Sequence, residues 1–140
     1  MSKVYALYHI VFCTRNRANT IPINHKEDLY RFIWKKLQEH KCTLIRIGGI
    51  PNHIHMLINL SPTIALSKLM QEIKSTSSGW MKNDDRFPKF NGWAAEYYAA
   101  TASPEHRHHI INYIKNQEAH HNVYSPDEEF EALLRSINQP

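Results

Sequence analysis

Two histidines and, further along the chain, a tyrosine and a glutamine have residue types and spacings suited to chemistry. His53 and His55 flank Ile54 in an apolar stretch. Side chains alternate across a strand, so the two imidazoles would share one face and offer two adjacent positions to a metal ion. A His-x-His pair is a short pattern, however, and the two residues also fit the ordinary polar end of a strand.

Tyr113 and Gln117 lie four residues apart in a segment with helical spacing. Residues four apart share one face of a helix, one above the other. Residues 110, 111 and 114 are isoleucines that already supply an apolar face, and Gln117 would continue that face poorly. The alternative interpretation makes Tyr113 part of an amphipathic core and leaves Gln117 in solvent.

The elements that must position these residues follow the order β-α-β-β-α-β and then two helices. Runs of β-branched and aromatic residues predict strands over residues 4–14, 42–50, 53–60 and 93–101. Apolar residues at helical spacing predict helices over 24–40 and from residues 66, 103 and 125. The first six elements match a split βαβ arrangement. We therefore expect one α+β domain over residues 1–140, with a ferredoxin-like βαββαβ antiparallel sheet and additional C-terminal helices.

Short local patterns predict how these elements begin and turn. Asn24 followed by Glu27 resembles a capping box at the start of the first helix. Residues 48–52, Gly-Gly-Ile-Pro-Asn, predict a hairpin, and residues 75–79 weaken the end of the second helix. Ser103 followed by Pro104 predicts a side-chain cap and then proline at the first helical position, which would give Tyr113 a rigid helix.

Composition narrows the class of protein. The formal charge of +4, from 17 basic and 13 acidic side chains, favours an anionic partner such as nucleic acid. Cys13 and Cys42 form no C-x-x-C pair and are expected to be reduced and buried. No stretch approaches the roughly 20 apolar residues that cross a bilayer, and the N-terminal stretch lacks a cleavage site. We expect a cytoplasmic protein with no membrane partner.

Several motifs, taken together and in order, resemble the single-tyrosine transposases of bacterial insertion sequences, which belong to the HUH superfamily. The relatives associated with repetitive extragenic palindromes are similar too. The resemblance covers nearly the whole chain. It is carried by Tyr8-His9-Ile10-Val11-Phe12 with Thr14-Arg15 and Arg17, by Pro51-Asn52-His53-Ile54-His55, by Ser67-Lys68-Leu69-Met70-Gln71 with Lys74-Ser75, and by Tyr113-Ile114-Lys115-Asn116-Gln117-Glu118 with His120-His121.

Carried over residue by residue, the resemblance implies that His53, His55 and Gln117 bind a metal ion and that Tyr113 is the nucleophile. Imidazole ligands by themselves suit zinc or other transition metals. The family implies Mg²⁺ or Mn²⁺, and manganese satisfies both arguments. Asn52 stands where the family often has aspartate. An amide still accepts a hydrogen bond from a ligand histidine, but it lacks the negative charge that raises the basicity of that ligand.

The resemblance also implies the substrate and the assembly. The expected partner is single-stranded DNA with hairpin ends, cleaved and rejoined through a covalent 5′-phosphotyrosine by a homodimer. In the family the tyrosine helix often docks against the partner's histidines. The sequence contains no Gly-rich phosphate loop, so we expect no nucleotide cofactor. Arg15, Arg17 and Lys74 are candidates for contacts to DNA phosphates, whereas Lys89 fits ordinary solvated surface.

Two other functions remain open from the sequence. The chain could be a domesticated transposase that binds nucleic-acid hairpins without chemistry, for which Asn52 is the only support. It could also be a zinc hydrolase that uses water as its nucleophile, which would leave Tyr113 idle. A covalent link between protein and DNA separates both alternatives from the transposase interpretation.

Overall fold

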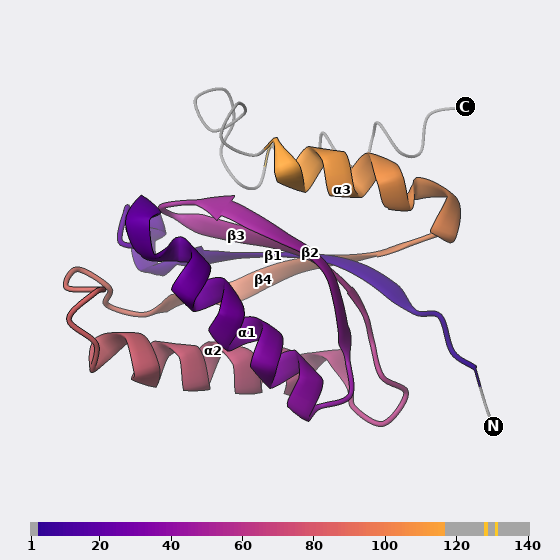
Figure 1. The fold of residues 1–140 in the computed structure, drawn as a ribbon, viewed down its shortest axis with the longest axis horizontal. Helices are drawn as coiled ribbons and strands as arrows, with labels where there is room; N and C mark the ends of the chain where they lie inside the picture. Colours follow the sequence, from indigo (N-terminus) through magenta and orange to yellow (C-terminus); the bar gives the residue numbers. More distant parts are fainter. Residues whose placement is uncertain (1–2, 117–127, 129–130, 132–140) are drawn as a thin grey trace.

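Four antiparallel strands form the centre of the molecule (Figure 1). The computed structural model describes residues 3–116 together with residues 128 and 131. Its sheet has the order β2-β3-β1-β4, in which every neighbouring pair is antiparallel. The strands are β1 (Leu7–Thr14), β2 (Thr43–Ile50), β3 (His53–Asn59) and β4 (Trp93–Ala102). This order confirms the predicted α+β class with a βαββαβ antiparallel sheet.

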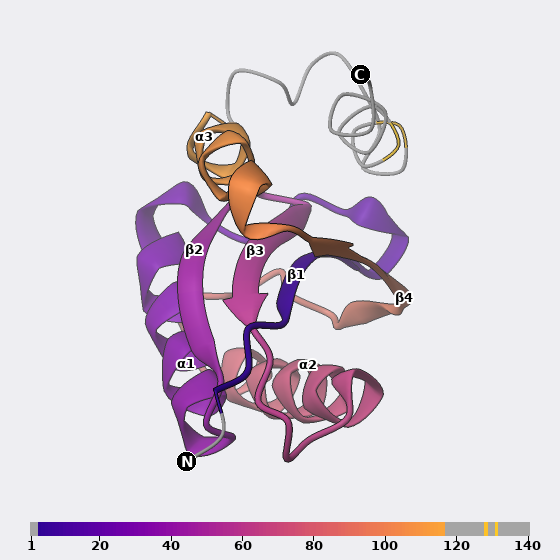
Figure 2. The same cartoon turned by 90° about the vertical axis from the view of Figure 1, so that its right-hand side faces the viewer.

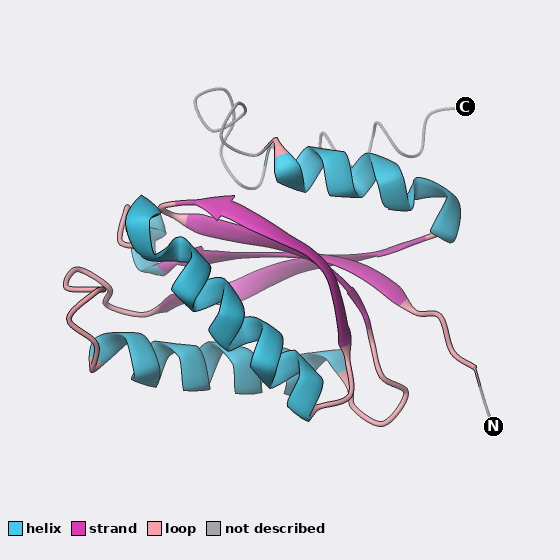
Figure 3. Ribbon diagram, in the orientation of Figure 1, coloured by secondary structure: helices cyan, strands magenta, loops and turns pink. Residues whose placement is uncertain are grey.

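Helices cover the sheet on both faces. Helices α1 (Lys26–Glu39) and α2 (Leu66–Lys82) lie on one face, and α3 (Arg107–Lys115) lies on the other (Figure 2). The long connection between α2 and β4 is a loop (Figure 3). Among the described residues, none of the helices is long and apolar enough to cross a membrane. The predicted helix that starts at residue 125 lies outside the described residues.

The main hydrophobic core lies between the sheet and α1 and α2. Alternate residues of β1 and β3 face it, since side chains alternate across a strand. The fully buried members include Ile10, Phe12, Ile54 and Met56 from the strands, with Leu29, Ile33, Leu37, Leu69 and Ile73 from the helices. Burying an aliphatic side chain of this size contributes about 1.5–3 kcal/mol, so this layer contributes strongly to the stability of the fold. Cys13 and Cys42 are buried and form no disulfide, as predicted.

The first helix begins differently from the prediction. A short 3-10 turn spans Ile23–His25, and α1 starts at Lys26 with no side-chain cap on the residue before it. The capping box of Asn24 and Glu27 is therefore wrong. Asp28 in the first turn instead lies 3.4 Å from Nδ1 of His25, where a carboxylate also suits the positive end of the helix.

The second helix runs past the serine-rich segment that was expected to weaken it. Ser77 is fully buried, and its hydroxyl donates to the carbonyl of Ile73 at 2.6 Å. The indole nitrogen of Trp93 donates to the same hydroxyl at 2.9 Å. The buried hydroxyl is satisfied within the fold, so the helix continues to Lys82.

The helix that carries Tyr113 starts near the predicted residues, with a different cap. Ser103 precedes a 3-10 turn over Pro104–His106, and α3 begins at Arg107. The hydroxyl of Ser103 contacts Nδ1 of His106 at 2.9 Å rather than a backbone N–H. Proline occupies the first position of the turn, as predicted, but the side-chain cap is wrong.

The predicted hairpin between β2 and β3 is confirmed, but its two glycines do not form the turn. The turn consists of Pro51 and Asn52 alone, so Gly48 and Gly49 lie inside β2. A Cβ on Gly48 would lie 2.8 Å from the carbonyl oxygen of Ile114 in α3. Glycine at this position therefore allows α3 to approach the sheet closely.

Candidate active site

Three histidines are buried on the sheet face that α3 covers. In the pairing of β1 with β3, Val11 lies opposite His55 and Cys13 lies opposite His53. His9, two residues before Val11, has the same orientation by strand alternation. The three imidazoles are at most 2% exposed. Because Ile54 belongs to the core on the other face, the predicted common face of His53 and His55 is confirmed.

His55 is at the centre of this group. Its Nδ1 lies 2.9 Å from Nε2 of His9, and the two rings are stacked with their centroids 5.2 Å apart. The ring of His53 meets it edge-on, with centroids 5.1 Å apart. Burial, and then the nearness of His55, hold the pKa of His9 well below its ordinary value, so His9 is neutral at pH 7.

Asn52 orients the other ligand candidate. Its Oδ1 lies 2.6 Å from Nδ1 of His53. An amide oxygen accepts hydrogen bonds, so Nδ1 of His53 carries the proton and donates it. The expectation that the amide of Asn52 accepts a hydrogen bond is confirmed, and any ligand role of His53 would then fall to Nε2.

Helix α3 brings Tyr113 to the histidines. The tyrosine ring is half-buried and lies 5.6 Å from the ring of His55 between centroids, at an angle of 63°. The helix is held by Ile110 and Ile114, which pack with Leu7 and Leu57 in a small apolar cluster. The isoleucines thus form the buried face, and Tyr113 lies beside that face, against His55.

The donor set fits part of the expected metal site. Within the described residues, no group of three or more histidine, cysteine, aspartate or glutamate side chains is arranged to hold a metal ion. His53 and His55 supply two neutral nitrogen donors, and their Nδ1 atoms both contact side chains of this chain. A ligand histidine that bonds a further group through its second nitrogen is the usual arrangement at metal sites. Gln117, the third predicted ligand, lies outside the described residues.

The three predicted DNA contacts come from two different elements. Arg15 and Arg17 form an exposed 3-10 turn directly after β1. Lys74 lies on α2, on the opposite side of the sheet from α3, and its amino group donates to the carbonyl of Ala95 at 3.0 Å. Burial lowers the pKa of Lys74. Helix α2 lies across the sheet from the histidines, but the amino group of Lys74 reaches the β4 edge, and Ala95 lines the same pocket as Arg17.

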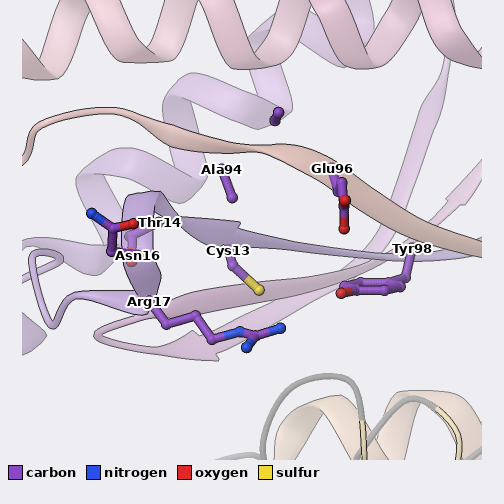
Figure 4. A pocket seen from close by; sticks show the side chains of 8 residues that line it. Cys13, Thr14, Asn16, Arg17, Ala94, Glu96 and Tyr98 are labelled. Atoms are coloured by element: carbon purple, nitrogen blue, oxygen red, sulfur yellow. The ribbon is translucent and has the colours of Figure 1, made fainter.

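A pocket of about 420 Å³ lies at the β4 edge of the sheet. Figure 4 shows Cys13, Arg17 and Tyr98 projecting to the same side of the sheet. Cys13 lies opposite His53 in the strand pairing, and Val11 lies opposite both His55 and Tyr98. The pocket therefore continues the face on which the histidines lie. Its lining residues are Cys13, Thr14, Asn16, Arg17, Ala94, Ala95, Glu96 and Tyr98.

Sequence reasoning missed the roles of His9 and Gly48. His9 was one of several histidines without an assigned role, and only the register of β1 against β3 brings it to His55. Gly48 was interpreted as a turn residue, although it lies opposite His55 in β2 and against Ile114 of α3. A histidine in a predicted strand, at the parity of a buried face, was the available signal for the first. No local signal marked the second.

A ferredoxin-like domain with paired buried histidines and a tyrosine on the helix above them is the arrangement that the resemblance implied for a transposase. The family model described as "Transposase IS200 like" matches residues 2–117. The chain therefore belongs to the IS200-like transposase family. Membership of this family makes it a DNA-cleaving enzyme of DNA transposition.

Similar proteins agree with this assignment. The transposase for insertion sequence element IS200 of Salmonella typhimurium is 30% identical over 118 residues, which cover 79% of this chain and 75% of that protein. The ISDra2 transposase TnpA of Deinococcus radiodurans is 23% identical over 120 residues, which cover 81% and 86%. The structure of a REP-associated tyrosine transposase bound to a REP hairpin has a TM-score of 0.65 at 18% identity, covering 89% of this chain and 74% of that one. The last match shows the shared fold.

Proposed function

We propose that this transposase cuts and rejoins single-stranded DNA through a covalent 5′-phosphotyrosine at Tyr113, with a divalent metal bound by His53, His55 and Gln117. The observation that carries the proposal is the position of Tyr113. Its ring lies 5.6 Å from that of His55, a buried histidine with the environment of a metal ligand. Both residues match the family's motifs.

The reaction is a transesterification at a backbone phosphate. The phenol oxygen of Tyr113 forms a bond to phosphorus, and the bond from phosphorus to the 3′ oxygen breaks. The phenol loses its proton, and the departing 3′ oxygen gains one as it becomes a hydroxyl. Because the new phosphodiester keeps the energy of the broken one, the reverse step rejoins DNA without ATP.

The protein groups prepare this step. Phenols ordinarily have a pKa of about 10 and are weak nucleophiles at neutral pH, so a nearby cation is needed. A bound Mg²⁺ or Mn²⁺ would polarise the phosphate and stabilise negative charge on the leaving oxygen. His53 and His55 would bind it through Nε2, since Asn52 and His9 contact their Nδ1 atoms. Neutral ligands leave the full charge of the ion for that task.

The proposed substrate is single-stranded DNA beside a hairpin. A structurally similar relative, the REP-associated transposase, is bound to a REP hairpin. In this chain the pocket lined by Arg17 and Tyr98 continues the histidine face, so it is a path for the strand that approaches Tyr113. Arg17 is suited to a phosphate and Tyr98 to stacking on a base.

A covalent adduct tests the proposal. The protein is incubated with hairpin-bearing single-stranded DNA from the ends of its element and Mn²⁺, and is then denatured and run on a gel. Wild type is expected to give a protein–DNA adduct. Tyr113→Phe should give none while still shifting the DNA in a native gel. Tyr97→Phe is the matched control, because Tyr97 packs in the core on the opposite face of the sheet and should keep the adduct.

The other outcomes identify different functions. An adduct that persists in Tyr113→Phe would move the nucleophile to another tyrosine. Cleavage without any adduct would favour a metal-activated water, as in a zinc hydrolase. Hairpin binding with neither cleavage nor adduct would make the chain a binding protein derived from a transposase.

We also propose a homodimer as the active form. The contact between Tyr113 and His55 forms within one chain, which supports a site built in cis. Mixed His55→Ala and Tyr113→Phe chains should then remain inactive. Restored cleavage would show that α3 exchanges between subunits. Full wild-type activity in a species that sediments as a monomer would contradict the proposal that the active form is a dimer.

A further inference from the structure

His9 is a buried polar side chain that has no part in the chemical step proposed above. It is 2% exposed and lies in the middle of β1, opposite Leu57 of β3 and Ala100 of β4. Its Nε2 is 2.9 Å from Nδ1 of His55, and the two rings are stacked. Burying an imidazole costs free energy unless its nitrogens are bonded, so this contact fixes the positions of both rings.

The contact between two imidazoles has a direction. In a neutral imidazole one nitrogen carries the proton and the other carries the lone pair. Of the two facing nitrogens, one therefore donates and the other accepts. A histidine that binds metal through Nε2 must carry its proton on Nδ1. For His55 this makes Nδ1 the donor, and Nε2 of His9 the acceptor.

We propose that His9 is a positioning residue that holds His55 in the Nδ1–H tautomer, so that Nε2 of His55 has its lone pair ready for a divalent metal. This inference rests on the proposed function. His9 acts on His55 as Asn52 acts on His53, and each acceptor lies at hydrogen-bond distance from its histidine. The two candidate ligands are thereby prepared by different groups from different elements.

The two acceptors differ in how they are held. Asn52 is the second residue of a two-residue turn and directly precedes the histidine that it orients. His9 is 46 positions from His55 and reaches it only through the register of β1 against β3. The orientation of His55 therefore depends on the sheet, whereas that of His53 is set locally.

Substitutions at His9 separate orientation from packing. In His9→Gln the side-chain oxygen can accept near the position of Nε2, whereas the shorter His9→Asn leaves it too far away. His9→Phe keeps the ring and removes the acceptor. His40→Gln and His40→Phe are the matched controls, because His40 is the residue directly after α1, a helix that lies on the opposite side of the sheet from α3 (Figure 2). Thermal unfolding shows which variants fold. If His9→Phe does not fold, the comparison of His9→Gln with His9→Asn decides whether His9 orients His55.

Two measurements are made on the full chain. Nitrogen-15 NMR of the imidazoles without metal reports the tautomer of His55. This tautomer should be Nδ1–H in wild type and in His9→Gln. It should shift toward Nε2–H in His9→Asn and His9→Phe. Calorimetric titration with Mn²⁺ should show binding weakened about 10- to 100-fold in His9→Asn and His9→Phe, the usual effect of losing such a partner. His9→Gln should recover most of the affinity, and the His40 variants should match wild type.

An unchanged tautomer together with unchanged Mn²⁺ affinity in folded His9→Asn would overturn the inference. Equal losses in the Gln and Asn variants would also overturn it, because they would indicate packing rather than an acceptor. If wild type binds no Mn²⁺, the proposed metal site fails, while the tautomer of His55 still decides whether His9 orients it.

Discussion

The two faces of the sheet are both buried, but they are built from different side chains. The face under α1 and α2 is apolar throughout its centre, with residues such as Phe12, Ile54 and Met56. The face under α3 combines a small apolar cluster, which includes Ile110 and Ile114, with three buried imidazoles. Apolar packing needs only shape and volume, whereas buried imidazoles need partners. The comparison indicates that one face supplies stability and the other supplies chemistry.

Neighbouring residues of β3 allow the comparison to be tested within a single strand. His55→Ala removes a proposed ligand and should lower cleavage by roughly 10³-fold or more, since a metal ion contributes several kcal/mol to such a transition state. Hairpin affinity should change little. Cleavage of a labelled hairpin substrate in Mn²⁺ measures the first, and a native gel shift measures the second. Full cleavage by His55→Ala would remove the assignment of this face.

Substitution of the preceding residue should have the opposite profile. Ile54 is fully buried on the face that α1 and α2 cover. Ile54→Val should cost about 0.5–1.5 kcal/mol and Ile54→Ala about 2–5 kcal/mol in the free energy of unfolding, because buried methyl groups are lost and a cavity remains. Urea unfolding measures both. Cleavage per folded molecule should stay near wild type, and a large loss of cleavage in Ile54→Val would mean that the two faces are not independent.

Gly48→Ala tests how closely α3 must lie on the second face. The added methyl group would lie 2.8 Å from the carbonyl oxygen of Ile114, so the helix must shift. A displacement of about 1 Å at a reacting group can cost up to about 10²-fold, so cleavage should fall about 10- to 100-fold while hairpin binding persists.

Gly79→Ala is the matched control for that change. Gly79 is exposed in α2, and an added Cβ there would meet nothing within 4 Å. Alanine in an exposed helix interior should raise the free energy of unfolding by up to about 1 kcal/mol and leave cleavage unchanged. If Gly48→Ala behaved like Gly79→Ala, the close approach of α3 would not matter for the reaction.

Much of this protein could be predicted from local pattern. The alternation around Ile54 placed His53 and His55 on one face, and apolar spacing separated the buried isoleucines of α3 from Tyr113. These inferences succeed because the periods of strand and helix are properties of the backbone. The order of elements then limits the topology to few possibilities, because connections are short and handed. The predicted side-chain caps at Asn24 and Ser103 were wrong, because a side-chain cap competes with other local hydrogen bonds of similar energy.

Only the tertiary structure decided which distant residues meet. The register of β1 against β3 brought His9 to His55, and a shift by one residue would have turned every side chain of β1 to the other face. The same folding brought Lys74 of α2 and Arg17 of the turn after β1 to one edge of the sheet, since Lys74 binds the carbonyl of Ala95 and Ala95 lines the same pocket as Arg17. Glycine is needed at position 48 because Ile114 of α3, far along the sequence, lies against it. Sequence spacing determines which residues share a face of a helix or strand. Which other element packs against that face depends on long-range contacts, and a local pattern contains no information about them.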